Sequence, residues 1–306
     1  VCLHSKLTNT MAIGVAVGDS PTGPFKDAIG RPLYEGSWDF IDPTVFVDDD
    51  GQAYLYWGNP NVYYAKLNAD MVSLDGEVSK VEQTIESFGS PGPDKREKGK
   101  KYKDIYTEGP WLHKRGGTYY LSYAAGGVPE HIAYSMSDTP TGPWKYMGEI
   151  MPLQDTGSFT NHCGVTDYKG NSYFFYHTGK LPGGGGFGRS VAVEQFSYNP
   201  DGTFPIINAT TEGVSPVGTL TPYQRVEAET IAFSEGVKSE WNAKTGVYVS
   251  GIHDGDYIKV REVDFEDLSP KCLCVSVASA LRGGWIEIRT DSIGGTLIAE
   301  MRVPHT

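Results

Sequence analysis

Glu108 has the setting of a proton donor. It lies in Tyr-Thr-Glu-Gly-Pro-Trp-Leu (106–112), where a Gly-Pro pair stiffens the backbone before a predicted hairpin around Gly117. The neighbouring Pro and Trp partly shield the carboxyl from water, and desolvation raises a carboxyl pKa, as a general acid near neutral pH requires. The alternative is a Glu at the start of a strand, hydrogen-bonded to nearby backbone.

The stretch that carries Glu108 leads into one copy of a hairpin that is repeated along the chain, so this repeat is expected to position the carboxyl. An apolar lead, a turn at Gly and an aromatic return strand occur at 45–57, around Gly117 and at 165–176, and the turn at 19–25 is almost repeated at 138–144. Sheet units at intervals of roughly 50–60 residues are typical of a β-propeller. A propeller can also serve as a scaffold without catalysis.

The pattern changes after a stretch rich in Thr, Gly, Ser and Pro at 210–221. Short alternating stretches of the kind found in β-sandwiches then follow at 225–229, 255–260, 273–278 and 285–289. The predicted domains are residues 1–221 and 222–306, both of them all-β.

Composition narrows the classes of ligand. A formal net charge of −12 argues against nucleic acid, which demands basic patches. No apolar run reaches the ~18 residues of a membrane span. The four cysteines show no metal-type Cys/His spacing. A neutral ligand such as a sugar fits this composition.

These stretches together resemble glycoside hydrolase family 43, whose members are five-bladed β-propellers. The matching motifs stand in the family's order at 19–27, 41–58, 107–112, 137–144, 161–164 and 188–190. The tail resembles a carbohydrate-binding module of family 6, a jelly-roll β-sandwich, at 226–229, 253–257 and 283–292. The combination is similar to secreted enzymes that degrade xylan and arabinoxylan, so the resemblance implies an extracellular protein.

The resemblance also assigns roles to two carboxyls. Hydrolysis in the family inverts the anomeric carbon, and Glu108 matches the general acid that protonates the leaving oxygen. Asp42, in Ile-Asp-Pro-Thr (41–44), matches the acid that orients the general acid and tunes its pKa. An Asp before Pro is expected to be extended, and its charge near Glu108 would raise the pKa of Glu108. The alternative for Asp42 is a turn-capping Asp.

The third family acid is the general base, an Asp on the first blade, ~6.5–9.5 Å from the acid. The residues before Asp42 already match the second blade, so we expect a chain that lacks the first blade and that base. Asp19, Asp27 and Asp39 are the upstream carboxylates, and the first two belong to the turn motif. We also expect the tail module to be incomplete at its C-terminal end. Whether the chain is active by itself stays open.

Further site residues come from the same resemblance. His162 would lie near the propeller axis, where some members hold calcium or water, and Arg189 would point into the site and pair with an acidic residue. The alternatives are a core histidine and an exposed Arg at a strand end. Four aromatic residues could stack on sugars or pack in the core, namely Trp38, Phe40, Trp57 and Trp111.

The implied metal is calcium, and the implied reaction requires no redox or organic cofactor. In the tail, Glu227 and Glu229 alternate on one strand face, where family 6 modules commonly hold structural calcium with oxygen ligands.

The leading function is therefore an inverting glycoside hydrolase of the α-L-arabinofuranosidase or β-xylosidase type, acting on arabinoxylan or xylan. The rival is a non-catalytic glycan-binding protein. A third alternative is a structural propeller for protein partners, against which the two acids and the Trp beside Glu108 argue.

Overall fold

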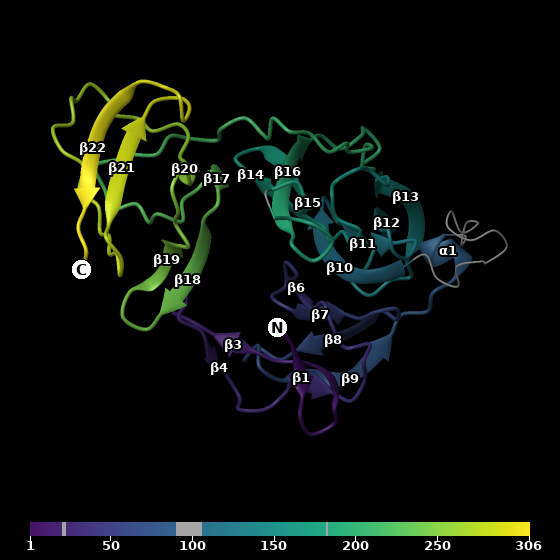
Figure 1. Ribbon diagram of the computed structural model, residues 1–306. Helices are drawn as coiled ribbons and strands as arrows, with labels where there is room; N and C mark the ends of the chain where they lie inside the picture. The colour runs from purple at the N-terminus through teal and green to yellow at the C-terminus, as the bar shows by residue number, and fades with distance from the viewer. Residues whose placement is uncertain (20–22, 90–105, 182) are drawn as a thin grey trace. The chain divides into compact units, whose positions relative to one another are not determined.

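The computed structural model describes residues 1–19, 23–89, 106–181 and 183–306. The chain forms two compact units, Val1–Val214 and Ser215–Thr306 (Figure 1). The division falls inside the stretch 210–221 that precedes the predicted boundary. Residues 20–22, in the first copy of the repeated turn, lie outside the described residues.

Unit 1 is built from antiparallel sheets whose strands follow one another in chain order. The first sheet has the order β1-β2-β5, with β1 (Cys2–Ser5), β2 (Thr10–Ile13) and β5 (Tyr34–Glu35), beside a small pair of β3 (Ala16–Val17) and β4 (Lys26–Asp27). The second comprises β6 (Thr44–Val47), β7 (Ala53–Trp57), β8 (Tyr63–Leu67) and β9 (Leu74–Lys80).

The next two sheets complete the described part of unit 1. The third comprises β10 (Tyr106–Arg115), β11 (Thr118–Ala125), β12 (His131–Ser137) and β13 (Lys145–Met151). The fourth comprises β14 (Gly164–Tyr168), β15 (Asn171–Thr178) and β16 (Ser190–Phe196). One short helix, α1 (Ile85–Phe88), follows β9, capped by Thr84. The predicted hairpins are confirmed, with turn-flanking pairs Val47–Ala53, Arg115–Thr118 and Tyr168–Asn171.

The central strands are buried on both faces, because side chains alternate between the two sides of a strand. One face of β7 packs against the third sheet through Tyr54 and Tyr56, and the other against the first sheet through Ala53, Leu55 and Trp57. In β11 the two faces supply Tyr119, Leu121 and Tyr123 to one core, and Tyr120 and Ala124 to the next. Each sheet therefore packs face to face on its neighbours, and in Figure 1 the sheets follow one another around a common centre. The all-β propeller prediction is confirmed.

The topology fixes which loops share an end. In an antiparallel meander the start of the first strand lies at the same end as the loop between the second and third strands. The starts of β6, β10 and β14 therefore lie at one end with the loops 58–62 and 126–130 and with the described loop residues 179–181 and 183–189. We call this end the rim.

Asp48 ties two sheets together at the opposite end. Lys114 Nζ lies 2.6 Å from Asp48 Oδ1, and the Tyr119 hydroxyl donates to Asp48 Oδ2 at 2.6 Å. The turn that follows β6 is therefore anchored to β10 and β11.

Unit 2 contains two-stranded antiparallel ladders. They pair β17 (Phe233–Glu235) with β20 (Tyr257–Lys259), β18 (Lys238–Asn242) with β19 (Gly246–Ser250), and β21 (Gly284–Arg289) with β22 (Leu297–Val303). The predicted strands at 225–229, which carries Glu227 and Glu229, and at 273–278 are wrong. Neither stretch pairs with a described strand, and a strand needs a partner for its backbone groups. A complete sandwich stays a prediction.

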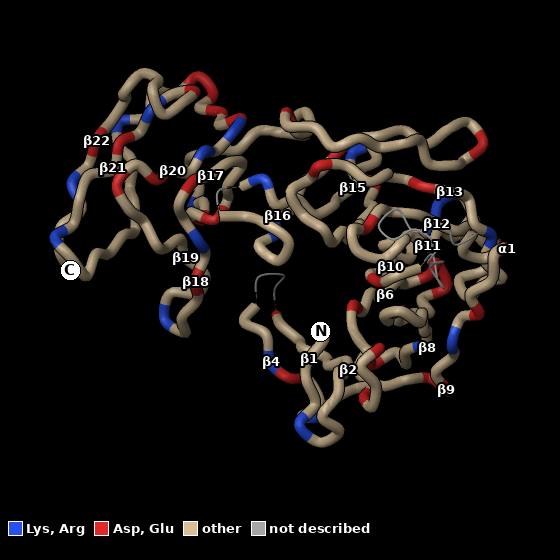
Figure 2. The backbone as a smooth tube through the Cα atoms, turned by 45° about the vertical axis from the view of Figure 1, so that its right-hand side comes forward, with Lys and Arg blue, Asp and Glu red and all other residues tan. Residues whose placement is uncertain are grey.

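Charged residues of both signs are interspersed along the tube of Figure 2. No helix in the described residues is long and apolar enough to cross a membrane.

Trp57 provides a test of the core. Its side chain has no exposed surface, whereas Trp38 is 62 % exposed. We expect Trp57→Ala to lower the free energy of unfolding by ~3–5 kcal/mol, because a large buried ring leaves a cavity. Trp38→Ala should change it by less than ~1 kcal/mol. Urea unfolding of both variants measures this, and equal losses would show that Trp57 is not a core residue.

Candidate active site

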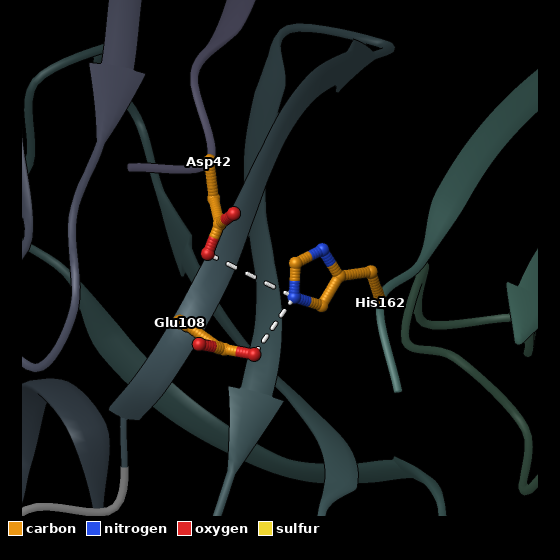
Figure 3. A group of neighbouring side chains, drawn as sticks. All are labelled: Asp42, Glu108 and His162. Atoms are coloured by element: carbon orange, nitrogen blue, oxygen red, sulfur yellow. Dashed lines mark hydrogen bonds and ion pairs between the residues drawn. The ribbon is translucent and has the colours of Figure 1, made fainter. Parts of the chain in front are cut away.

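Three side chains from three sheets meet at the rim. Asp42 precedes β6, Glu108 lies in β10 and His162 precedes β14 (Figure 3). His162 Nε2 lies 3.1 Å from Glu108 Oε1 and 3.8 Å from Asp42 Oδ2. The structure thus brings together the two predicted acids and the predicted axial histidine.

The backbone at Asp42 is not extended. Its φ is 57°, in the left-handed region, so the expectation of an extended Asp before Pro43 is wrong. Hydrogen bonds hold the segment in place, from Gly58 N to Ile41 O at 2.9 Å and from Asn59 N to Asp39 O at 3.1 Å. A non-Gly residue in this region costs ~1–3 kcal/mol, which such surrounding bonds must offset.

Gly109 lets His162 approach Glu108. Its φ is 59°, and a Cβ on Gly109 would lie 2.8 Å from carbon atoms of the His162 ring. Only glycine accommodates both the backbone conformation and the close ring.

The charge on Glu108 is stabilised by its neighbours. Burial alone would raise the pKa of Glu108, but its hydrogen bonds to His162 and Asn59 lower the pKa overall. The expectation of a raised pKa for Glu108 is therefore wrong. Burial raises the pKa of Asp42, and the nearby charge of Glu108 adds to this effect.

Glu130 is a site residue that the sequence analysis missed. It is 6 % exposed, and its Oε2 accepts a hydrogen bond from Asn161 N at 2.7 Å. Burial and the charge of the adjacent Glu108 raise the pKa of Glu130 to about 7. The signal in the sequence was an acidic residue in the rim loop directly after β11, the strand that pairs with β10.

His162 is stabilised in its charged form. Burial alone would lower the pKa of His162, but the hydrogen bond to Glu108 and the charges of Asp42 and Glu108 raise it overall. The ring stacks on His177 at 5.1 Å between centroids. Burial and the positive charge of His162 lower the pKa of His177 to about 4.

Arg189 faces this site from the start of β16. Its Nη1 donates to Thr160 Oγ1 at 3.1 Å, and its positive charge partly offsets the rise in the pKa of Asp42. The predicted pairing with an acid is thus replaced by a hydrogen bond to a hydroxyl.

Comparison with known families agrees with this geometry. The description "Glycosyl hydrolases family 43" matches residues 1–204. The chain belongs to glycosyl hydrolase family 43. Residues 227–306 match the family 6 carbohydrate binding module.

Similar proteins include two arabinoxylan arabinofuranohydrolases. The one from Bacillus subtilis (strain 168) is 34 % identical over 340 residues, covering 96 % of this chain and 62 % of the relative. The one from Paenibacillus polymyxa is 33 % identical over 338 residues, covering 96 % and 49 %. The chain thus spans about half to three fifths of the length of these relatives.

A solved structure is similar over the whole chain. It is a family 43 arabinoxylan arabinofuranohydrolase from Bacillus subtilis in complex with cellotetraose, with a TM-score of 0.74 and 29 % identity, covering 100 % of this chain and 69 % of that one.

A cavity of about 220 Å³ adjoins the family 43 site. It is lined by Asp42, Pro43, Thr44, Gly109, Pro110, Trp111, His162 and Cys163. Asp42 Oδ2 and Trp111 Nε1 are buried and have no hydrogen-bond partner within the described part of the chain. Since a water takes ~30 Å³, the cavity has room and polar atoms for ordered water.

Two of the predicted sugar platforms are core residues. Trp57 is 0 % exposed and Phe40 is 8 % exposed, and both pack in the core between the first and second sheets. Neither presents a ring face to solvent, so their predicted contact with sugar is corrected to packing. Trp111 is partly buried and contributes to the cavity wall.

The three site residues are a poor calcium cage. Their donor atoms lie within 4.8 Å of one another, but the imidazole nitrogen already contacts a carboxylate, and calcium prefers six to eight oxygen ligands. In the module, Arg225 engages both oxygens of Glu227 at 2.8 and 3.0 Å. Glu229 Oε1 is buried and has no hydrogen-bond partner among the described residues. Calcium at either place stays a prediction.

The upstream carboxylates have structural partners or remain unassigned. Asp39 Oδ2 accepts from Asn61 at 2.6 Å and from Tyr63 at 3.1 Å, and Asp27 accepts from the backbone of Ile29 and Gly30. Nothing in the described residues assigns a base role to Asp19.

Gly109→Ala tests the site geometry. The new Cβ would displace His162 from Glu108, so the raised pKa of His162 should fall toward its ordinary value. The strained φ should also cost ~1–3 kcal/mol of unfolding free energy. Gly117→Ala is the matched control, because its φ is also positive, at 89°, and its Cβ would meet nothing within 4 Å. NMR titration of His162 measures the shift, and an unchanged pKa in the Gly109 variant would contradict this geometry.

Glu130→Gln tests the buried carboxyl. The folded protein keeps the Glu130 proton up to about pH 7, whereas an unfolded Glu loses it near ~4.3. Between these values the folded state binds more protons, so the parent's free energy of unfolding falls as pH rises. We expect Glu130→Gln to make the decrease in the free energy of unfolding over this pH range smaller by roughly 1–3 kcal/mol.

Urea unfolding from pH 4.5 to 7.5 measures the effect. Glu77→Gln, at an exposed position in β9, is the control and should keep the parent's slope. Parallel pH profiles for the parent and the Glu130 variant would show that Glu130 has no raised pKa.

Proposed function

We propose that the protein is an inverting glycosidase that removes arabinofuranosyl or xylosyl units from arabinoxylan, xylan or their oligosaccharides. The observation that carries this proposal is the meeting of Glu108, Asp42 and His162 on the rim of a family 43 propeller. The names of the relatives, arabinoxylan arabinofuranohydrolases among them, support the substrate class.

In this proposal Glu108 donates a proton to the leaving oxygen, and water attacks the anomeric carbon from the opposite side. Asp42 opposes ionisation of Glu108 through its like charge and helps to orient it. The attacking water requires a base ~6.5–9.5 Å from the acid, and we leave that residue unassigned.

The proton on Glu108 depends on the bound substrate. A glycan seated on the rim excludes water and competes with Asn59 and His162 for the Glu108 oxygens, and both effects raise the pKa of Glu108. Glu130, adjacent to Glu108, keeps its own proton up to about pH 7.

We further propose that the protein acts outside the cell, because its polymeric substrate cannot enter one. Immunodetection in culture medium and in washed cells tests this, and a signal confined to the cells would contradict it. The predicted calcium is tested by the change in melting temperature on chelation and on calcium addition. An unchanged melting temperature would argue against a structural ion.

Glu108→Gln is the central test of catalysis. The chain, and any longer natural form of it, is assayed on arabinoxylan oligosaccharides and on p-nitrophenyl arabinofuranoside and xyloside. We expect kcat on the oligosaccharides to fall by ~10²–10⁴-fold, since a sugar leaving group needs the proton. The fall should be much smaller on the aryl glycosides, whose leaving group is stable as an anion.

The exposed-site variant Glu77→Gln should keep full activity on all substrates. Equal losses of Glu108→Gln on both kinds of substrate would show that Glu108 is not the proton donor. The released sugar decides between arabinofuranosidase and xylosidase.

The alternative is a non-catalytic glycan-binding protein, favoured by the family 6 module over 227–306. In that case the parent and Glu108→Gln would bind xylan equally and neither would release sugar. Isothermal titration with xylo-oligosaccharides, run beside the activity assay, separates the two functions.

A further inference from the structure

Two phenylalanine rings form an exposed pair at the rim. The centroids of Phe159 and Phe187 lie 5.0 Å apart, with the rings at 87°. Phe187 is 81 % exposed and Phe159 is 38 % exposed. The edge-to-face arrangement is a favourable one for aromatic rings, but most of the Phe187 surface remains in water. Core packing therefore does not explain Phe187.

The backbone of Gly186 packs against the Phe159 ring. A Cβ on Gly186 would lie 1.7 Å from Phe159 Cε1, so the Phe159 ring packs directly over the Gly186 backbone. The loop is tied down by hydrogen bonds from Gly185 N to Gly188 O at 3.0 Å and from Ser158 Oγ to Gly186 O at 3.3 Å. The glycines permit this close backbone packing, and it holds the two rings in place.

Hydrogen bonds connect the segment that carries Phe159 to residues beside Glu108. Phe159 O accepts a hydrogen bond from Glu130 N at 3.0 Å, and the Glu130 carboxyl lies beside Glu108. Arg189, two residues after Phe187, donates to Thr160, the residue after Phe159. Hydrogen bonds therefore join the segment that carries Phe159 to Glu130 and to Arg189, two residues of the Glu108 site.

The chemistry of the rings selects the occupant. One face of a pyranose ring presents C–H groups, which pack on an aromatic face while the hydroxyls stay hydrated. An exposed apolar pair next to a reaction centre is the kind of feature that marks a binding site. A neutral sugar also needs no counter-charge, and neither phenylalanine supplies one.

From this geometry we infer that Phe159 and Phe187 bind a pyranose unit of the glycan chain that forms the leaving group. The inference rests on the proposed glycosidase function and deepens it, because it assigns recognition of the polymer to the propeller itself. On this inference the pair contacts a sugar beyond the scissile bond, so an oligosaccharide would reach it and a small aryl glycoside would not.

The test compares two substrates in one set of variants. The oligosaccharide is a xylo-oligosaccharide that carries one arabinose, and the small substrate is p-nitrophenyl arabinofuranoside. We expect Phe187→Ala and Phe159→Ala to raise KM for the oligosaccharide about tenfold, equivalent to ~1.4 kcal/mol, with kcat little changed. KM for the aryl glycoside should stay constant. Phe187→Trp should restore the parent value, because a larger aromatic ring still stacks.

Val191→Ala is the matched control, an aliphatic residue that is 73 % exposed at the same rim. It should leave both KM values unchanged. Unchanged KM for the oligosaccharide in both phenylalanine variants would overturn the inference. So would equal losses on both substrates, which would indicate a structural role. If the variants instead abolish self-association in sedimentation and leave KM unchanged, the pair is a contact between copies of the chain.

Failure of the proposed function is distinguishable from failure of this inference. If the parent turns over neither substrate, glycosidase activity is wrong, and titration calorimetry with the same oligosaccharide decides the role of the pair. A weaker affinity in Phe187→Ala, restored in Phe187→Trp, supports the sugar site. Equal affinity in parent and variant overturns it, even if the module binds sugar by itself.

Discussion

The contact between His162 and Glu108 depends on how closely the innermost strands of neighbouring sheets approach each other. It forms only because Gly109 has no side chain and because β10 and β14 begin at the same end of unit 1. The face-to-face packing of the sheets brings these two strand starts together, so the Glu108–His162 site results from the same packing that forms the cores. Substitutions that weaken the packing of one sheet on its neighbour would therefore disturb the site, even with every site residue unchanged.

Charge is distributed unevenly around this contact. His162 is stabilised as a cation and Glu108 as an anion, while burial favours the neutral forms of Asp42 and Glu130. The attraction between His162 and Glu108 offsets part of the cost of holding three carboxyls close together. Such neighbouring groups with opposed pKa shifts are common where a protein must move a proton.

Much of this could be predicted from the sequence. The hairpins around Gly51, Gly117 and Gly170 have local signatures, and the motifs around Asp42 and Glu108 are short and distinctive. What failed depended on contacts between distant segments. The left-handed backbone of Asp42 is held by bonds to the 58–59 segment, and a local rule for residues before proline cannot include them.

The same reason explains the other misses. Trp57 and Phe40 look like sugar platforms in sequence, but the face that each presents is covered by a sheet from elsewhere in the chain. Glu130 lacks a motif of its own, and its place beside Glu108 follows from the pairing of β10 with β11. The stretch at 273–278 alternates as a strand should, yet a strand exists only with a neighbour.

The meander topology has a practical consequence for handling the protein. Because β14 starts at the rim and pairs antiparallel with β15, the short turn at Gly170 between them lies at the end away from Glu108 and His162. A dye, an affinity tag or an immobilising linker attached there leaves the rim of unit 1 unmodified. A chip or bead could thus hold unit 1 by the end opposite the rim.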